Sequence, residues 1–315
     1  KMFSVLPSYL YNIWYKGGLN KSGKYTAPNP PAGAVIDYFI KDSIKATKGE
    51  KLKHESPVKI VITDSKGAVV DTLYGTEHKG INRMEWNLNY SSGQMLSTDT
   101  LQGKHPNYHA GPQAIPGTYK ITVEFNGEKQ SQNFELRPDP RIPFNYNAAE
   151  EQFNASKEIQ DEISAMNIML NRIDNIHGQI VNLKNALNNN ASSSNDGSEF
   201  KNVLKGANNL DSMLTLIKDT VMDTKAQPGV GEDDIHYTTK LRNWIIGMKY
   251  WLSSDYDSAP NDMLKGEMIN LRTALETYID KFNYITGTEI LSFNKLASEN
   301  NAPVLIAGPP IKIPN

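Results

Sequence analysis

The sequence predicts a protein of two parts, an antiparallel β-sandwich followed by an antiparallel helical bundle of about four helices. Up to about residue 138 the apolar residues alternate with polar ones in short runs, which is the period of strands. From about residue 148 they recur every three or four positions, which is the period of helices. The length of 315 residues also suits about two domains.

The first part contains six short runs that read as strands, with no helical pattern between them. The turns have suitable chemistry, since Asp64 to Gly67 can close one hairpin and Asn126-Gly127 suits a type I′ turn. Such a succession predicts a small sandwich. The runs are AVIDYFIK (34–41), VKIVITDS (58–65), AVVDTLYG (68–75), INRMEWNLNY (81–90), GTYKITVEFNG (117–127) and QSQNFELRP (130–138).

Trp86 is the most informative residue of these runs. Positions 84, 86, 88 and 90 are apolar and share one strand face, so Trp86 is predicted to lie in the core. The alternative is an exposed tryptophan that stacks on a sugar or a base. Gly80 and Asn82 precede it at the strand entrance, where glycine can adopt positive φ and asparagine can bond its own backbone.

The second part has four apolar stripes at helical spacing, which together suggest one bundle. The last stripe continues past Gly287 to about Leu296. The connectors are polar or rich in proline and glycine, as loops are. The stripes cover residues 159–187, 200–221, 241–252 and 264–285, and the connectors are NNNASSSNDGS (188–198), TKAQPGVGEDD (224–234) and SSDYDSAPND (253–262).

Two stretches, VKIVITDSKGAVVDTLYGTEHKGINRMEWNLNY (58–90) and PGTYKITVEFNGEKQSQNFELRPDPR (116–141), resemble the immunoglobulin-like module of the flagellar hook-capping protein. They are more similar to the module at the end of bacterial BNR-repeat propeller proteins, often labelled sortilin-like (VPS10-like) or glycosyl hydrolase. NPPAGAVIDYFIKD (29–42) is similar to the segment that joins propeller and module. The resemblance covers the chain from about residue 28 and implies an Ig-like sandwich followed by helices.

The resemblance also implies a setting. It makes the chain a piece of an exported bacterial protein of the periplasm, cell surface or secreted fraction, whose export signal, if any, lies upstream. An upstream β-propeller or another cell-envelope protein is then the expected partner. The aspartate-box repeat of the propeller, S-x-D-x-G-x-x-W, occurs nowhere in the sequence. No catalytic or ligand-binding residue of the propeller can therefore be transferred to this chain.

These observations divide the chain into four expected regions. Residues 1–28 form an aromatic linker from an upstream domain, 29–140 the Ig-like sandwich, 146–298 the helical bundle and 299–315 an extended C-terminal tail. Three prolines in LRPDPRIPFNYN (136–147) disfavour a helix or strand across the junction, so the two parts are expected to fold separately. Prolines also exclude a helix in the tail, but its apolar residues predict that it lies against the protein.

The motifs in the sequence predict no catalytic, cofactor-binding or metal-binding residue and no cofactor. Asp174 and His177 have a metal-like spacing without a second pair, so a polar seam residue is the simpler interpretation. HPNYH (105–109) reads as a solvated loop, and the acidic run at 232–234 reads as helix capping. YLYNIWYKGG (9–18) could form a sugar platform, but a linker that packs its rings onto a neighbouring domain is favoured.

Two classes of function remain. With 33 Lys and Arg against 35 Asp and Glu, no net charge draws the chain towards nucleic acid or an anionic membrane, and no apolar run could span a bilayer. The favoured class is a non-catalytic protein-interaction or scaffolding region. The alternative is an accessory glycan-binding region of a glycoside hydrolase, but hydrolysis needs two converging carboxyl groups and the sequence offers no recognisable pair.

Overall fold

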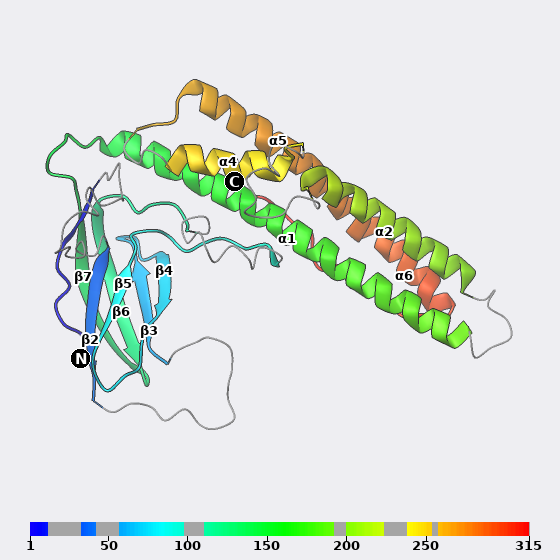
Figure 1. Cartoon of the computed structure of the whole chain (residues 1–315), viewed down its shortest axis with the longest axis horizontal. Coiled ribbons are helices and arrows are strands. Elements are labelled where there is room, and N and C mark those ends of the chain that lie inside the picture. Colours follow the sequence, from blue (N-terminus) through cyan, green and yellow to red (C-terminus); the bar gives the residue numbers. More distant parts are fainter. Residues whose placement is uncertain are drawn as a thin grey trace, which may run out of the picture. The chain divides into compact units, whose positions relative to one another are not determined.

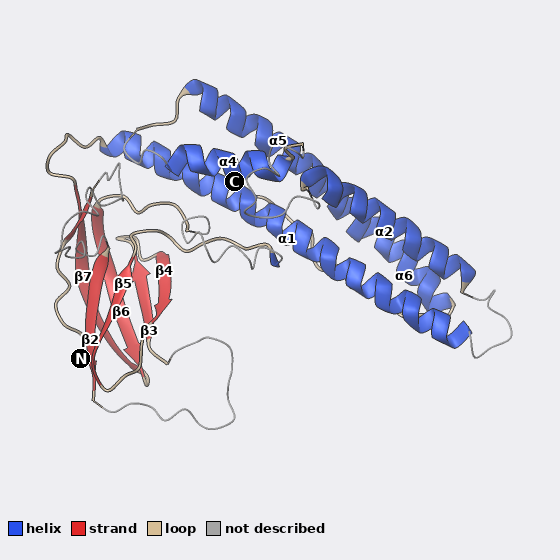
Figure 2. Ribbon diagram, in the orientation of Figure 1, coloured by secondary structure: helices blue, strands red, loops and turns tan. Residues whose placement is uncertain are grey.

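The computed structural model describes seven stretches of the chain, in which strands come first and helices follow, as the sequence predicts (Figures 1 and 2). The chain divides into two compact units, here the strand unit (Lys1–Ser91, Ala110–Phe153 and Tyr256–Ala259) and the helix unit (Ser92–His109, Asn154–Asp255 and Pro260–Asn315). The described residues are 1–11, 33–41, 57–97, 110–191, 200–223, 238–253 and 258–314.

The strand unit contains a five-stranded sheet in the order β1-β7-β6-β3-β4 and a two-stranded sheet of β2 and β5. Each of the six predicted runs contains a strand, and β1 is a further strand that the pattern did not predict. The larger sheet is mixed rather than wholly antiparallel, because β1 pairs with β7 in parallel. The strands are β1 (Ser8–Leu10), β2 (Ala34–Ile40), β3 (Lys59–Thr63), β4 (Val69–Tyr74), β5 (Gly80–Trp86), β6 (Gly117–Phe125) and β7 (Glu128–Pro138).

Trp86 belongs to the apolar core that the two sheets share, and it is fully buried. Its ring meets Tyr119 and Phe134 edge to face, with centroids 5.3 and 6.0 Å away, and its Nε1 donates to the carbonyl of Asn89 at 2.8 Å. The core interpretation of Trp86 is confirmed. The run is shorter than predicted, because β5 ends at Trp86 and Leu88 is buried in a left-handed conformation (φ 63°).

Asn82 lies inside β5 and closes the turn that precedes it. Its Oδ1 accepts from Thr76 Oγ1 and from the His78 N–H, and its Nδ2 donates to the carbonyls of His78 and Gly80. These bonds satisfy a buried amide that would otherwise destabilise the fold. Gly80 has the expected positive φ, 107°.

Residues 1–10, which fall in the stretch expected to be a linker (1–28), belong to the strand unit. The Phe3 N–H donates to the Asp37 carbonyl on β2, whereas β1 pairs with β7. The Gln132 side chain of β7 donates to the Phe3 carbonyl at 2.9 Å. The segment therefore bonds to both sheets, a pairing that its own sequence pattern does not reveal.

Each of the four apolar stripes lies on a helix of the described chain, and the fourth helix continues through a π-helical turn at Gly287 into α6. Asn261 is the N-cap of α5, where its side chain accepts from the Leu264 N–H at 2.9 Å. The helices are α1 (Tyr146–Ala191), α2 (Lys201–Val221), α4 (Leu241–Ser253), α5 (Asp262–Tyr284), η3 (Ile285–Glu289) and α6 (Ile290–Glu299).

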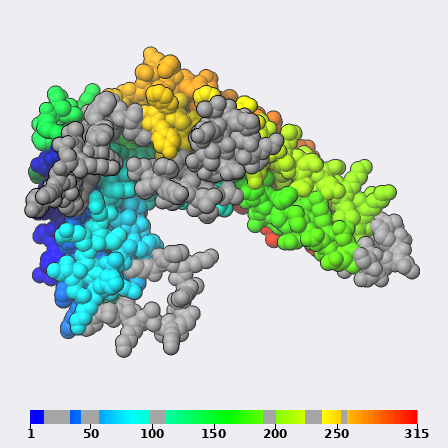
Figure 3. Space-filling model, in the orientation of Figure 1, coloured from blue at the N-terminus to red at the C-terminus, as the bar shows by residue number. Residues whose placement is uncertain are grey.

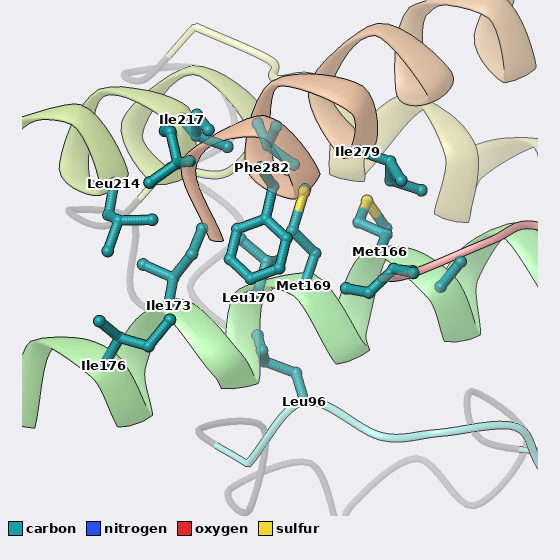
Figure 4. Packing of buried hydrophobic residues seen from close by; sticks show 14 of the residues in the cluster. Leu96, Met166, Met169, Leu170, Ile173, Ile176, Leu214, Ile217, Ile279 and Phe282 are labelled. Carbon is teal, nitrogen blue, oxygen red and sulfur yellow. The ribbon is translucent and has the colours of Figure 1, made fainter. Parts of the chain in front are cut away.

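The helices share one apolar core, to which a residue far upstream contributes (Figure 4). Phe282 of α5 is fully buried and lies beside Met169 and Leu170 of α1. Leu96 approaches α1 from an extended segment and is only 2% exposed. The core of the helix unit is therefore completed by a side chain from the stretch between β5 and β6.

Replacing Trp86 tests the core of the strand unit. Trp86→Ala should lower the free energy of unfolding by about 3–5 kcal/mol, because the lost ring leaves a cavity that the surroundings fill only in part. Chemical denaturation of the whole chain, followed by circular dichroism, measures the change. Ile81→Ala on the same strand is the control, since Ile81 is 71% exposed and its loss should alter the midpoint little. An unchanged midpoint for Trp86→Ala would contradict the assignment.

Candidate functional site

The Asp174–His177 pair lies on α1 and is bonded to α2. Asp174 Oδ1 accepts from Lys218 Nζ, and His177 Nδ1 lies 2.7 Å from Asp211 Oδ1. Both side chains therefore contribute to a polar seam between two helices. Over the stretches that the structure describes, no three potential metal-ligating side chains gather in one place.

The other stretches singled out in the sequence are described in part or not at all. HPNYH and the acidic run at 232–234 lie outside the described residues. Of the aromatic N-terminal stretch, Tyr9 and Tyr11 are described, and their rings stack with centroids 5.7 Å apart. The guanidinium groups of Arg137 and Arg141 lie 5.9 and 5.3 Å from these two rings, so arginines of the strand unit already occupy the neighbourhood of both rings.

The feature of the helix unit with the most chemistry is a polar stripe along α1. Its members recur every three or four residues, so they share one face of the helix. Side chains with an amide or a hydroxyl can bond to main-chain N–H and C=O groups. The stripe consists of Gln160, Ser164, Asn167, Asn171, Asn175 and Gln179.

The middle of the stripe holds residues 92–97, here called the loop segment. Asn171 Nδ2 donates to the Met95 carbonyl and Asn171 Oδ1 accepts from the Ser97 N–H, both at 2.8 Å. One amide thus satisfies a donor and an acceptor of a chain that has no sheet neighbour. Leu96, between the two bonded residues, is buried against the helices.

Closer to the start of α1 the stripe extends this contact. The Gln94 N–H donates to Ser164 Oγ at 3.2 Å, and Asn167 Nδ2 donates to the Gln94 carbonyl at 2.8 Å. Gly93 passes so near to α1 that a Cβ there would lie 1.9 Å from Ser164 Oγ and 2.5 Å from Gln160 Nε2. A larger residue at this position would therefore displace the side chains of Ser164 and Gln160.

The far end of the stripe holds residues 302–314, here called the C-terminal segment. Gln179 accepts from the Ile306 N–H at 2.8 Å and donates to the Ile306 carbonyl at 2.9 Å. Asn294 of α6 makes the same pair of bonds with Leu305, both at 2.8 Å. The segment lies extended against the helices, held through its main chain.

Further contacts fix the rest of the C-terminal segment. Asn283 Oδ1 accepts from the Ile311 N–H at 2.9 Å, and its Nδ2 donates to the Ile311 carbonyl at 2.8 Å. Arg172 Nη1 donates to the carbonyl of Pro309. Three side-chain amides in total therefore each bond both main-chain polar groups of one residue of the segment. We call these pairs the amide clamps.

A groove of about 330 Å³ lies on α1 between Gln94 of the loop segment and Ile306 of the C-terminal segment. Apolar side chains combine there with a few polar groups, as in most ligand sites. Asn175 is exposed at the groove and its Oδ1 accepts from Gln179 Nε2 at 2.7 Å. The groove is lined by Gln94, Ile168, Asn171, Arg172, Asn175, Ile176, Ile306 and Ala307.

A carboxyl group is buried on the same helix. Glu162 is fully buried, and neither of its carboxyl oxygens has a hydrogen-bond partner among the residues that the structure describes. Burial, helped by Glu158 and Glu276 and opposed by Arg272, raises the pKa of Glu162 to about 8. Glu162 is therefore mainly protonated at neutral pH. Arg272 bonds to Glu158 and Glu276 and also donates to the carbonyl of Pro314 at 3.0 Å.

A partly buried amine lies near the start of the polar stripe. Burial lowers the pKa of Lys249 on α4 to about 8. Its Nζ donates at 2.9 Å to Oε1 of Gln160, the first member of the stripe. The amine and the stripe thus tie α4 to α1.

Helix α4 carries a second candidate surface. It reaches the surface beside α5 in Figure 3, and Trp244 is 58% exposed. The chain on either side of α4, residues 224–237 and 254–257, lies outside the described residues. We assign no site to this face.

Comparison of the chain with family models, with curated proteins and with solved structures finds no match. None of the described helices is both long enough and apolar enough to cross a membrane. The geometry of the helix unit is therefore the main guide to function.

The polar stripe was not predicted from the sequence, because the predicted helices were identified from the spacing of their apolar residues. The same spacing in polar residues was visible, since an amide or hydroxyl recurs at every step from residue 160 to 179. Exposed polar residues are normal on a solvated helix face, so the stripe alone does not predict a bound segment.

Glu162 makes the stability of the helix unit depend on pH. Its folded pKa of about 8 lies above its ordinary value of 4.5, so between these values the folded state retains a proton that the unfolded state has lost. Stability should therefore fall as pH rises from about 4.5 to 8. Glu162→Gln, which cannot ionise, should flatten this fall in a pH series of melting temperatures. Glu150→Gln, on an exposed position of α1, should retain the wild-type profile. Parallel profiles for wild type and Glu162→Gln would contradict the assignment.

Proposed function

We propose that this chain is a non-catalytic interaction or scaffolding region of an exported bacterial propeller protein, and that its helix unit binds an extended segment of a partner polypeptide. One observation carries the proposal. Helix α1 already binds two extended stretches of chain through their main-chain groups, and the groove between them is open.

The chemistry of the groove favours a peptide over a sugar. Amide side chains recognise N–H and C=O groups that every polypeptide presents, and apolar floor residues such as Ile168 and Ile176 suit its side chains. None of the described residues that line the groove is aromatic, whereas sugars commonly stack on aromatic rings. A single extended strand of partner chain would meet polar groups from Asn175 and Arg172 on the floor.

The proposal includes an Ig-like sandwich for the strand unit. Tyr119, at the start of β6, donates its hydroxyl hydrogen to the carbonyl of Ile115 at 2.6 Å, which is the arrangement of a tyrosine corner. The strand orders β1-β7-β6-β3-β4 and β2-β5, with an N-terminal segment bonded to both sheets, also suit such a sandwich. In the BNR-repeat propeller proteins that the sequence resembles, this module adjoins the propeller, which is the proposed covalent or bound neighbour.

A library of random 12-residue peptides displayed on phage tests the proposed function on the whole chain. Peptides selected by the wild type should bind Asn175→Trp at least tenfold more weakly, because the new ring fills the groove; a tenfold change is about 1.4 kcal/mol. Asn209→Trp, at an exposed position of α2, is the control and should bind like the wild type.

Two outcomes would reject this function. Selected peptides that bind Asn175→Trp as tightly as the wild type would place peptide binding outside the groove. Specific binding to a glycan array, with no peptide selected, would favour the accessory glycan-binding region instead.

A further inference from the structure

The C-terminal segment is bound to the helix unit in the way a peptide ligand is bound. Leu305 and Ile311 are buried in the core that the helices share, whereas Val304 and Ile306 point outward and are exposed. Leu305 and Ile311, the two apolar anchors of the segment, are six residues apart. Leu305 and Ile311 are held both by their buried side chains and by bonds to their main-chain groups, as residues of a bound peptide are.

The amide clamps bond only the main-chain groups of the segment and do not contact its side chains through hydrogen bonds. Gln179, Asn294 and Asn283 come from α1, α6 and α5, so the binding surface is assembled from three helices. Arg272 of α5 donates to the carbonyl of Pro314, near the end of the segment. The clamps hold the main chain, and the buried side chains of Leu305 and Ile311 add the fit to this particular sequence.

A single turn joins the segment to the rest of the protein. Asn301 has a left-handed conformation (φ 52°) just after α6. The Asn301 N–H donates to the Ser298 carbonyl at 3.2 Å and the Ala302 N–H donates to the Ala297 carbonyl at 2.8 Å, which is a Schellman motif. Extension of this one residue would direct the segment away from its own helices.

We propose that two copies of this chain exchange their C-terminal segments, so that residues 302–314 of each copy occupy the helix surface of the other. The exchanged pair makes the same anchors and amide clamps as the single chain and differs only at the joint near Asn301. The complementarity to this segment is the reason to name a second copy as the occupant. The proposal needs no foreign partner and does not depend on the proposed function.

The conformation of the turn at Asn301 controls the exchange. Proline fixes φ near −65° and lacks an N–H, so Asn301→Pro disfavours the closed turn, whereas glycine adopts positive φ readily and Asn301→Gly retains it. At low concentration the closed form is favoured, because a tethered segment has a high effective concentration. Light scattering should show dimers of Asn301→Pro at a concentration at least tenfold lower than for Asn301→Gly. Equal association of the two variants would overturn the proposal.

Cross-linking identifies which segment is exchanged. Because the sequence contains no cysteine, the reagent reacts only with the thiols that are introduced. Gln179 Nε2 bonds both Asn175 and Ile306, so these two exposed residues are neighbours. Asn175→Cys and Ile306→Cys are placed on separate chains of different mass, each with Asn301→Pro, mixed and treated with a short bismaleimide. A product that joins the two chains is expected, at least fivefold more than with Asn301→Gly.

Two controls define the result. Asn209→Cys, on α2, replaces Asn175→Cys and should give only the background of random collisions. A chain that carries both Asn175→Cys and Ile306→Cys should cross-link internally when the segment remains on its own helices. Internal products without products between chains would overturn the exchange, and so would a dimer that forms without cross-linking between chains.

Discussion

The need to satisfy main-chain polar groups is the constraint on which the helix unit depends. An extended chain packed against a helix has no neighbouring strand, and an unpaired buried N–H or C=O costs about 1–3 kcal/mol. The polar stripe of α1 removes this cost for the loop segment and, with Asn283 and Asn294, for the C-terminal segment. Once these bonds form, Leu96, Leu305 and Ile311 can enter the core.

The loop segment and the C-terminal segment bring residues that are far apart in the sequence into contact with the long helix α1. Helix α1 has 46 residues and, at about 1.5 Å per residue, is about 70 Å long. Such a helix cannot bury its apolar face alone, and α2, α4, α5 and α6 cover it in stages. The segments add contacts between residues more than 70 positions apart, such as Ser97 with Asn171 and Ile306 with Gln179. Within this assembly Glu162 is buried and Lys249 is partly buried, so the charged form of each side chain is disfavoured.

Local patterns predicted the elements of the fold, and contacts between distant residues were not predictable in the same way. The alternation around Trp86 placed it in the core, and the positive φ of Gly80 was predicted from turn chemistry. Strand β1 was missed because its three residues are determined by pairing with β7. The docking of residues 92–97 was missed for the same reason, since Leu96 looks like any loop leucine until Asn171 is brought beside it. The amide clamps depend on polar side chains that, from the sequence alone, are expected to face solvent.

Amide hydrogen exchange of the whole chain tests most directly whether side-chain amides hold these segments. The N–H groups of Ser97, Leu305 and Ile311 donate to side-chain oxygens and not to main-chain carbonyls, yet they should exchange at least about tenfold more slowly than in an unstructured chain. Asn171→Ala should remove the protection of Ser97 and leave that of Leu305, and Asn294→Ala should do the reverse. Rapid exchange at all three residues in the wild type, or protection that neither substitution alters, would contradict the account.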